Sequence, residues 1–536
     1  MVVAALALLW PAAAAGAATV ELVPMGSQNG VALPPWLRIA GGEGSDDLRL
    51  HGARVTATTE LHAGPGCHTD APGSVACDPG GGGALAFTRV DLRGGDDRFE
   101  VVAAPPGDHA IDVKGGPGDD TLVAYTGSGT WDGESGADRI LGGRGWTISY
   151  RYYYGRVDIS LDGVANDGEP GERDDVGSSA SLVIGGGGPD RLRGGDLPVE
   201  LEGKFGDDVL EAGSARAELY GDEGRDLLLG GAVGDRLEGG EDNDVLVGGG
   251  GNDALNGARG ADRSDGGDGN DVIALDPFGD RRPDVAVGGP GRDLVAWDET
   301  PAKLLTVDLS DDRGPDGLAG EQDAIAGGIE DVRATAATFA IVGSDGPNVL
   351  VLAGEGAVDG RGGDDVLFAN VALEGDVGVI GGAGADRIET GRGARVDARD
   401  GGADVVRCHG QSTRDLRLDA GVDRTSACAP AVVVNGGEVV SAGRRRPGAR
   451  VRFDLICTDW FNACRASIVP RLVRPGTGRG PALAPLALTI PASGARTGSV
   501  RLPVGTSPGR RLLRLDVTTT PPWLGVPRTA AARSSG

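Results

Sequence analysis

The stretch GGGGPDRLRGGDLPVELEGKFGDDVL at residues 185–210 sets the pattern for a large part of this chain. Glycines cluster before Asp190, a leucine follows two residues later, and the same arrangement returns at Asp208 and Leu210. Glycine adopts backbone conformations that other residues avoid, so each cluster predicts a tight turn, and the apolar residue after it predicts a short strand. The stretch therefore predicts a repeating unit of one turn and one strand.

The register of this unit holds without an insertion through ten copies. Counted in nines, the sixth positions are Asp190, Val199, Asp208, Ala217, Asp226, Asp235, Asp244, Asp253, Asp262 and Asp271. The eighth positions hold Leu or Ile in every copy but one, where Ser264 stands. A fixed period with one apolar residue per unit is typical of a solenoid, in which stacked units bury these side chains against one another.

Seven segments match the pattern Gly-Gly-x-Gly-x-Asp-x-apolar without a mismatch. They are GGEGSDDL at 41, GGPGDDTL at 115, GGGGPDRL at 185, GGGGNDAL at 248, GGDGNDVI at 266, GGPGRDLV at 288 and GGAGADRI at 381. The pattern resembles the nonapeptide of the hemolysin-type (RTX) calcium-binding repeat proteins. The resemblance implies an all-β fold, a right-handed parallel β-roll (β-solenoid) with two nonapeptides per coil, and Ca²⁺ held between stacked turns as the cofactor.

The residue types of the turn suit a hard cation. Aspartate supplies carboxylate oxygens and glycine lets backbone carbonyls converge, while Ca²⁺ takes six to eight oxygen ligands. Sixth positions 18 residues apart are expected to stack on one edge, with up to four ions along Asp190–Asp262 and up to two along Asp235–Asp271. The candidate ligands are Asp46, Asp120, Asp138, Asp190, Asp208, Asp226, Asp235, Asp244, Asp253, Asp262, Asp271, Asp293, Asp365 and Asp386. The alternative for any one of them is a residue that caps a glycine turn without a metal.

Several further copies are less regular. Asp97 fits the local pattern but breaks phase with its neighbours, as Asp46, Asp293 and Asp365 also do, and Asp404 lies 18 residues after Asp386. Asn348 occupies an aspartate position in a degraded copy, so no ion is expected there.

Two insertions, at about 146–184 and 297–342, interrupt the repeats and share the pattern D-G-x-x-G-E-x-D-x-[V/I], at 167–176 and 316–325. Each is interpreted either as an additional calcium loop or as a solvated hairpin between coils, and the hairpin is favoured. This element, together with the segment from Cys408 to Cys428, resembles actinobacterial-type secreted calcium-binding repeat proteins.

The ends of the chain differ from its middle. Residues 1–18 are apolar with small residues near a possible cleavage point and predict a signal peptide, and no later stretch is apolar enough to span a membrane. Residues 19–110 predict an N-terminal β-rich cap with early repeats, residues 111–430 the β-roll, and residues 431–536, rich in Arg and Pro, a small β-sandwich-like domain. In an exported protein the sequence-near cysteine pairs Cys67/Cys77, Cys408/Cys428 and Cys457/Cys464 predict structural disulfides.

The charge distribution and the lack of known catalytic motifs limit the classes of function that this sequence fits. Residues 431–536 hold 16 arginines against 4 acidic residues, so they carry +12 of a total of −28 and the rest of the chain carries −40. Such a body repels nucleic acid and attracts cations. The five histidines form no H-E-x-x-H and no G-x-S-x-G occurs, so no enzyme is expected.

The sequence predicts a secreted, extracellular or cell-surface calcium-dependent structural or adhesion module, with a cell-surface glycan or the extracellular matrix as possible partner. The alternative is a secreted hydrolase or toxin-like protein with its active site in the terminal regions.

Overall fold

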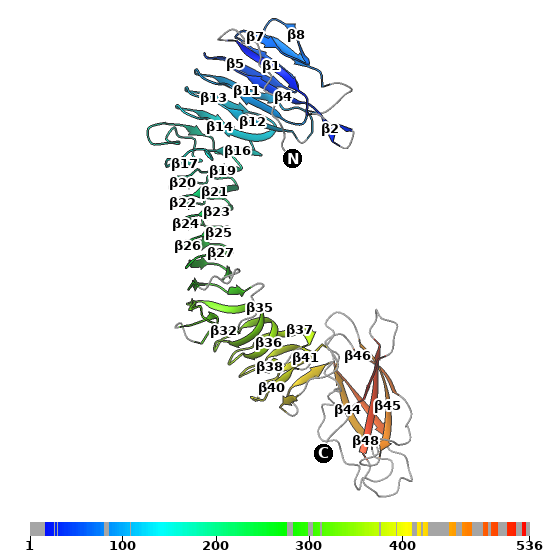
Figure 1. The fold of residues 1–536 in the computed structure, drawn as a ribbon. Helices are drawn as coiled ribbons and strands as arrows, with labels where there is room; N and C mark the ends of the chain where they lie inside the picture. Colours follow the sequence, from blue (N-terminus) through cyan, green and yellow to red (C-terminus); the bar gives the residue numbers. More distant parts are fainter. Residues whose placement is uncertain are drawn as a thin grey trace. The chain divides into compact units, whose positions relative to one another are not determined.

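The computed structural model describes residues 17–426, apart from gaps at 26, 29–30, 80–84, 108, 276–281, 298–303, 311–313, 375–376, 393, 410–414 and 420–421, together with strands at 450–456, 464–473, 486–490, 495–501, 512–520 and 528–531. These residues form strands and turns, and no helix occurs among them (Figure 1). The chain divides into two units, residues 1–273 with 289–291 and residues 274–288 with 292–536, each of which is described by itself. Residues 1–16 of the predicted signal peptide lie outside the described residues, and its last residue, Ala18, is also the first residue of strand β1 (Ala18–Val23).

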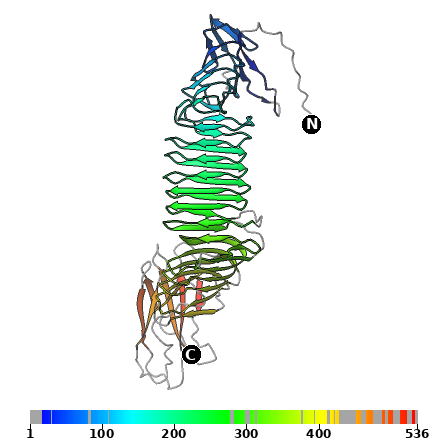
Figure 2. The same ribbon diagram turned by 90° about the vertical axis from the view of Figure 1, so that its left-hand side faces the viewer.

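The uninterrupted repeats of unit 1 form two parallel sheets that face each other across a thin core (Figure 1), and Figure 2 shows their strands stacked one above another. One sheet stacks β21 (Val199–Phe205), β23 (Ala217–Glu223), β25 (Arg236–Glu241) and β27 (Ala254–Arg259). The other stacks β20 (Arg191–Arg193), β22 (Val209–Glu211), β24 (Leu227–Leu229), β26 (Val245–Gly250) and β28 (Arg263–Asp268). Every pair is parallel, and partners such as Leu201 and Leu219 lie 18 residues apart, so two nonapeptides make one coil as predicted.

The core is the column of eighth-position side chains. Leu201, Leu219, Leu237 and Leu255 from one sheet, and their counterparts from the other, are at most 1% exposed. Ser264 occupies the same position and is 2% exposed, so the coil keeps its geometry where the apolar group is missing. Because each coil adds only two such side chains, burial alone contributes little per coil, and contacts between turns must supply much of the cohesion.

The parallel stack begins well before the predicted boundary at residue 110. Strand β4 (Trp36–Ala40) pairs with β10 (Thr88–Asp91), which pairs with β12 (Ala110–Lys114). Antiparallel strands stand at the beginning of the stack: β1 runs antiparallel to β4, and β8 (Cys67–Ala71) pairs with β9 (Ser74–Cys77). The predicted Cys67–Cys77 disulfide is confirmed and joins β8 to β9.

In the first insertion a short segment of the chain runs antiparallel to its neighbours before the parallel stack continues. Strand β18 (Asp175–Val176) stacks parallel on β15 (Arg139–Leu141), and β17 (Asp158–Ser160) stacks parallel on β20. Antiparallel bridges from Asp167 to Asp174 and from Gly168 to Asp158 connect β18 to β17. The insertion is therefore a hairpin set into the sheet, and its Asp167 and Asp174 are buried, so the expectation of a solvated hairpin is wrong for these side chains.

The second insertion repeats this construction in unit 2. Asp316 bridges Asp323 in antiparallel fashion, and β33 (Gly317–Leu318) pairs antiparallel with β32 (Leu304–Asp308). The shared sequence pattern thus has a shared structure, a local strand reversal after which the parallel stack resumes.

The remainder of unit 2 continues as parallel strands and then changes to antiparallel ones. Strands β35 (Ile329–Val342), β36 (Val349–Asp359), β37 (Val366–Glu374), β39 (Arg387–Arg392), β41 (Val405–Cys408) and β43 (Arg424–Ser426) stack in parallel. Antiparallel pairs follow, β44 (Arg450–Ile456) with β47 (Ala495–Arg501), and β45 (Cys464–Val473) with β46 (Leu486–Ile490) and β48 (Leu512–Thr520), which pairs with β49 (Arg528–Ala531). The sandwich-like packing of these strands stays a prediction.

Only part of the two remaining predicted disulfides lies within the described residues. Cys408 is buried and disulfide-bonded. Its predicted partner Cys428, and Cys457 with the side chain of Cys464, lie outside the described residues, so both pairings stay predictions.

Candidate metal centre

Hydrogen bonds from one coil to the next join the stacked sixth-position aspartates. The backbone N–H of Asp190 donates to Oδ1 of Asp208 at 2.7 Å, and the same bond runs from Asp208 to Asp226, from Asp226 to Asp244 and from Asp244 to Asp262 at 2.8 Å. We call such a series an aspartate ladder. One carboxylate oxygen of each aspartate is thereby fixed by the backbone of the preceding coil.

The opposite edge of the same coils carries a shorter ladder, as the register predicts. Asp235 donates its N–H to Oδ1 of Asp253 at 2.7 Å, and Asp253 donates to Asp271 at 2.8 Å. Ala217 stands one coil before Asp235 and donates its N–H to Oδ1 of Asp235, so the ladder begins where the sequence first places an aspartate.

A third ladder runs through the N-terminal part of unit 1 and includes residues that the sequence did not place there. It connects Asp46 to Asp97 (2.6 Å), Asp97 to Asp120 (2.8 Å), Asp120 to Asp138 (2.9 Å) and Asp138 to Asp174 (2.8 Å). The separations are 51, 23, 18 and 36 residues, so a strict period could not find it. Asp174 belongs to the first insertion, whose shared sequence pattern was the available signal.

The fourth ladder lies in unit 2. It runs from Asn348 to Asp365, Asp386, Asp404 and Asp423, with distances from 2.8 to 3.3 Å. Asp365 and Asp386 were predicted ligands, and the structure adds Asp404 beside them.

We call each member of a ladder a rung. The second carboxylate oxygen, Oδ2, distinguishes two kinds of rung. Within the ladders, many Oδ2 atoms are buried and accept no hydrogen bond. They belong to Asp97, Asp120, Asp138, Asp208, Asp226, Asp244, Asp253, Asp365, Asp386 and Asp404. A buried carboxylate oxygen without a donor is costly, so its presence in so many equivalent positions calls for a positive partner.

The first rungs are different because their Oδ2 atoms are capped by the protein itself. Oδ2 of Asp190 accepts the N–H of Gly186 at 2.6 Å, and Oδ2 of Asp235 accepts the N–H of Gly231 at 2.7 Å. Asp46 is capped in the same way by Gly42. These three aspartates match the alternative of a turn-capping residue, and their role as calcium ligands stays a prediction.

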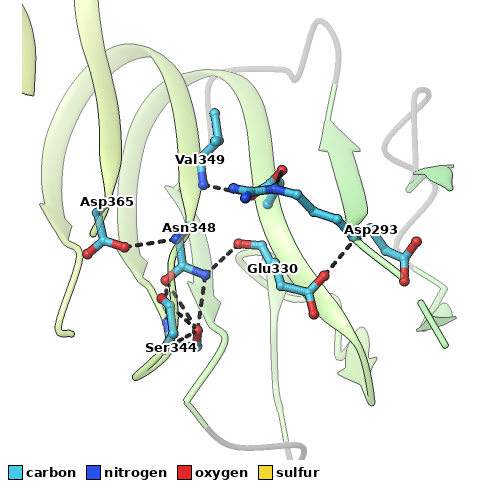
Figure 3. Close-up of polar contacts among 9 residues, drawn as sticks. Asp293, Glu330, Ser344, Asn348, Val349 and Asp365 are labelled. Carbon is cyan, nitrogen blue, oxygen red and sulfur yellow. Dashed lines mark hydrogen bonds and ion pairs between the residues drawn. The ribbon is translucent and has the colours of Figure 1, made fainter. Parts of the chain in front are cut away.

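Two further rungs are capped by side chains. The hydroxyl of Tyr150 donates to Oδ2 of Asp174 at 2.8 Å. At Asn348 an uncharged amide replaces the carboxylate, and both of its polar atoms are hydrogen-bonded. Nδ2 donates to the carbonyl of Glu330 at 2.5 Å, and Oδ1 accepts the N–H of Ser344 at 2.8 Å (Figure 3). Both polar atoms of the Asn348 amide are thus bonded within the protein, and the expectation that no ion binds there stays a prediction.

Asp293 lies in a modified version of the same contact. Its N–H donates to Oε2 of Glu330 at 2.9 Å, so a glutamate here takes the position that an aspartate has in the ladders (Figure 3). Asp293 is buried, as are Asp262 and Asp271.

Glycine at the first position of each turn makes room for the free oxygen. A Cβ placed on Gly221 would lie 2.2 Å from Oδ2 of Asp226 and 2.5 Å from the carbonyl oxygen of Gly239 in the next coil. On Gly203 the corresponding distances are 2.2 Å to Oδ2 of Asp208 and 2.9 Å to the carbonyl oxygen of Gly221. A carboxylate oxygen and a backbone carbonyl from neighbouring coils therefore converge in space that any side chain would fill.

The electrostatics of the ladders oppose ionisation. Burial, together with the charges of the neighbouring aspartates in the ladder, raises the pKa of Asp208 and of Asp244 to about 8. Burial likewise raises the pKa of Asp138 to about 8 and of Asp120 to about 7. At neutral pH these carboxyls need either protons or cations to remain inside the fold.

The ladders fit a hard divalent cation. They offer carboxylate and carbonyl oxygens, which Ca²⁺ prefers, and no His or Cys contributes. No group of three or more His, Cys, Asp or Glu side chains gathers around a single point in the described part of the chain. Each site would therefore have to combine a few carboxylates with backbone carbonyls from two coils.

An outer row of side chains supports the turns independently. Oδ1 of Asp207 accepts the N–H of Arg225 at 3.1 Å, and Oδ1 of Asn243 accepts the N–H of Ala261 at 2.9 Å. These fifth-position residues are exposed and bond to the following coil, whereas the ladder aspartates bond to the preceding one. The sequence analysis missed this role, although the recurrence of Asp or Asn before the sixth position was a usable signal.

Comparison with known proteins agrees with this geometry. The family model of the RTX calcium-binding nonapeptide repeat matches four times, at residues 114–145, 202–237, 229–264 and 238–273. No curated protein matches the chain significantly. The matched segments are a parallel β-roll of calcium-binding repeats. The chain thus contains hemolysin-type (RTX) repeats, and Ca²⁺ is the ion that such repeats bind.

Proposed function

We propose that this protein is an extracellular module whose solenoid is ordered by Ca²⁺ and which serves a structural or adhesive role. The observation that carries the proposal is the series of buried, unpartnered Oδ2 atoms along the ladders. Those atoms are stable in the folded chain only when protons or cations neutralise them.

The residues that would hold the ions are the interior rungs. In the regular part of unit 1 these are Asp208, Asp226 and Asp244 on one edge and Asp253 on the other, together with carbonyls such as that of Gly239. When bound, Ca²⁺ supplies positive charge and oxygen–metal bonds between coils. The aspartates hold their own positions through Oδ1, and the first-position glycines keep the approach open.

In an extracellular protein, the higher Ca²⁺ concentration outside the cell would fill these sites and order the solenoid after export. Extracellular calcium modules bind with Kd on the order of 10⁻⁴–10⁻³ M, so such sites are empty at cytosolic calcium levels. The apolar N-terminal segment and the Cys67–Cys77 disulfide support export. Among the described residues, no helix is long and apolar enough to cross a membrane. The chain would then be loosely folded before export and ordered outside, where its net charge of −40 outside residues 431–536 meets calcium.

We favour this role over a secreted hydrolase or toxin-like protein because the sequence contains no recognised catalytic motif and most described residues belong to the repeats and their insertions. An active site in residues 431–536 would contradict this choice, and hydrolase assays on the full chain test for it.

The direct test is a far-ultraviolet circular dichroism titration of the protein without residues 1–16, begun in chelator. We expect a cooperative gain of β signal with Ca²⁺ and none with equal Mg²⁺, since Mg²⁺ resists the loss of its water ligands. The double variant Asp208→Ala/Asp226→Ala should shift the midpoint to higher Ca²⁺, while Asp207→Ala, next to them but exposed, should not. A spectrum already β-rich in chelator and unchanged by Ca²⁺ would refute the proposal.

A further inference from the structure

The two sheets of the regular repeats in unit 1 turn different side chains toward solvent. In both sheets, buried and outward-facing residues alternate along each strand. The outward residues of β21, β23 and β25 are mostly charged: Glu200, Glu202, Lys204, Glu218, Tyr220, Asp222, Arg236 and Glu238. Those at the start of β22, β24 and β26 are apolar except for one glutamate: Val209, Glu211, Leu227, Leu229, Val245 and Val247. The same nonapeptide thus builds a charged side and an apolar side.

The apolar residues form one continuous surface. Val209 pairs with Leu227 and Leu227 with Val245, while Leu229 pairs with Val247. Neighbouring strands lie about 4.8 Å apart, so the three rows of side chains stand next to one another. We call these five residues the apolar face, and Figure 2 looks onto the sheet that carries it. Val245 is 37% exposed and the other four are half-buried.

Charged rows close the apolar face at both ends. Arg191 and Arg193 precede it in register and form ion pairs with Glu211. Arg263 and Asp265 follow it and pair with each other at 3.7 Å. An apolar centre within a polar rim is the usual composition of a protein–protein interface. Because parallel sheets are almost always covered on both sides, we interpret this face as the site of a protein partner.

The order of the residues points to a second copy of the chain as that partner. The column through the first outward position of each strand reads Arg191, Val209, Leu227, Val245 and Arg263, an order of residue types that is the same in both directions. A two-fold axis along β24 therefore places Leu227 opposite itself and Val209 opposite Val245. A shift by one coil would instead place an arginine opposite a valine. Two-fold contacts between identical surfaces are the commonest kind in protein assemblies.

The charges at the two ends fit the same arrangement. In the second column, Arg193 comes to lie opposite Asp265 of the second copy, which has the opposite charge. Arg191 comes to lie opposite Arg263, but each of them is already paired with a carboxylate of its own chain. The net charge of −40 outside residues 431–536 opposes association of two copies, so calcium bound to the repeats favours association by lowering this repulsion.

We propose that the apolar face of β22, β24 and β26 binds the same face of a second copy in a calcium-dependent, two-fold symmetric dimer. This inference deepens the adhesive role by naming its partner, and it rests on that part of the proposed function. Three apolar rows cover far less than the roughly 800 Å² per partner of a stable interface, so the dimer should be weak and form at high protein concentration. Copies held together on a surface would add many such contacts.

The test is sedimentation equilibrium of the chain used for the calcium titration, at about 10–500 µM protein, in about 1 mM Ca²⁺ and in chelator. We expect the average mass to rise from one copy toward two in Ca²⁺ and to stay at one copy in chelator. The double variant Leu227→Glu/Val245→Glu should associate at least tenfold more weakly, because each new charge faces an apolar row of the second copy. The matched control Ala254→Glu/Val272→Glu adds the same charges at the equivalent outward positions of the opposite sheet, and it should associate like the wild type.

A second measurement locates the axis without adding charge. Leu227→Cys should give a disulfide-linked dimer on oxidation, because the two-fold axis brings this position next to itself, and Ala254→Cys should not. Circular dichroism with Ca²⁺ on the same samples checks that each variant is folded.

Three results would overturn the inference: a wild type that stays monomeric at every concentration in Ca²⁺, a double variant that associates as strongly as the wild type, or a dimer of equal strength in chelator. A monomer in Ca²⁺ would mean that something other than a second copy covers the apolar face. If the β signal of that monomer still responds to Ca²⁺, the calcium switch stands while the dimer is refuted. A chain that pairs while its spectrum ignores Ca²⁺ would refute the calcium switch instead.

Discussion

Replacing one interior rung by its uncharged isostere should lower the free energy of unfolding in calcium and leave it unchanged or raise it in chelator. In Asp244→Asn the side chain keeps its shape and its Oδ1, which accepts the N–H of Asp226 at 2.8 Å. The substitution removes one negative charge and the unpartnered Oδ2. Its effect on the free energy of unfolding therefore depends on what neutralised that charge.

In calcium the variant should be less stable. A site with Kd near 10⁻⁴ M contributes RT ln(1 + [L]/Kd), about 1.4 kcal/mol at 1 mM Ca²⁺. Asp244 stands between Asp226 and Asp262 in its ladder, so the sites on both of its sides would be weakened. The expected loss is about 1.4–3 kcal/mol, and the dependence of unfolding free energy on log[Ca²⁺] should become shallower by about 1.4 kcal/mol per decade for each lost site.

In chelator the same variant should be as stable as the wild type or more stable. Burial, then the charges of Asp226, Asp262 and Asp242, raise the pKa of Asp244 to about 8, so at pH 7 the folded chain must retain a proton there. The new amide removes that requirement. Its Nδ2 takes the place of Oδ2, next to the carbonyl oxygen of Gly257 in the following coil, to which it can donate a hydrogen bond. One such hydrogen bond contributes about 1 kcal/mol.

The measurement is urea unfolding of wild type and variant, followed by circular dichroism at 1 mM Ca²⁺ and in chelator. Asp207→Asn serves as control because Asp207 is exposed and keeps its bond to Arg225 through Oδ1 in either form. Equal destabilisation of Asp244→Asn in both media would show that the carboxylate is structural, and the reasoning would fail.

Further predictions use the same ladders. Gly221→Ala should lower calcium affinity, because its Cβ would lie 2.2 Å from Oδ2 of Asp226, whereas Gly44→Ala, with nothing within 4 Å, should not; calorimetric titration compares them. In chelator, stability should fall as pH rises from 5 to 8, since carboxyls such as that of Asp208, with a folded-state pKa of about 8, bind protons that the unfolded chain has lost. Thermal unfolding against pH measures this, and a flat profile would contradict it. Calcium binding at pH 7 should release protons in weakly buffered solution, and no change in pH would contradict it. Asn348→Asp should destabilise the chelated protein and raise its calcium dependence, and a variant that unfolds like the wild type in both media would refute the role given to this amide.

Much of the fold could be predicted because its rules are local. A glycine-rich turn, an aspartate and one apolar residue recur every nine positions from residue 190, and this register alone fixes which leucines are buried and which aspartates stack. The ladders from Asp190 to Asp262 and from Asp235 to Asp271 were therefore predicted correctly as columns. The disulfide at Cys67 and Cys77 followed from the same kind of local reasoning.

Phase failed where the chain leaves the solenoid. Asp97 and Asp174 join a ladder although 23 and 36 residues separate them from their neighbours, because excursions add residues without adding a coil. A period counted along the sequence includes those residues, while stacking in space does not.

The sequence by itself determined the period, the core and the oxygen-rich character of the turns, because each depends on residues within a few positions of one another. Only the tertiary structure decided which carboxylate oxygens are free. Asp190 and Asp226 have the same local pattern, yet Oδ2 of Asp190 is capped by Gly186 at the beginning of its ladder and Oδ2 of Asp226 accepts no bond inside it. This difference depends on which backbone lies in the neighbouring coil, and that is set by the stacking of the coils in unit 1.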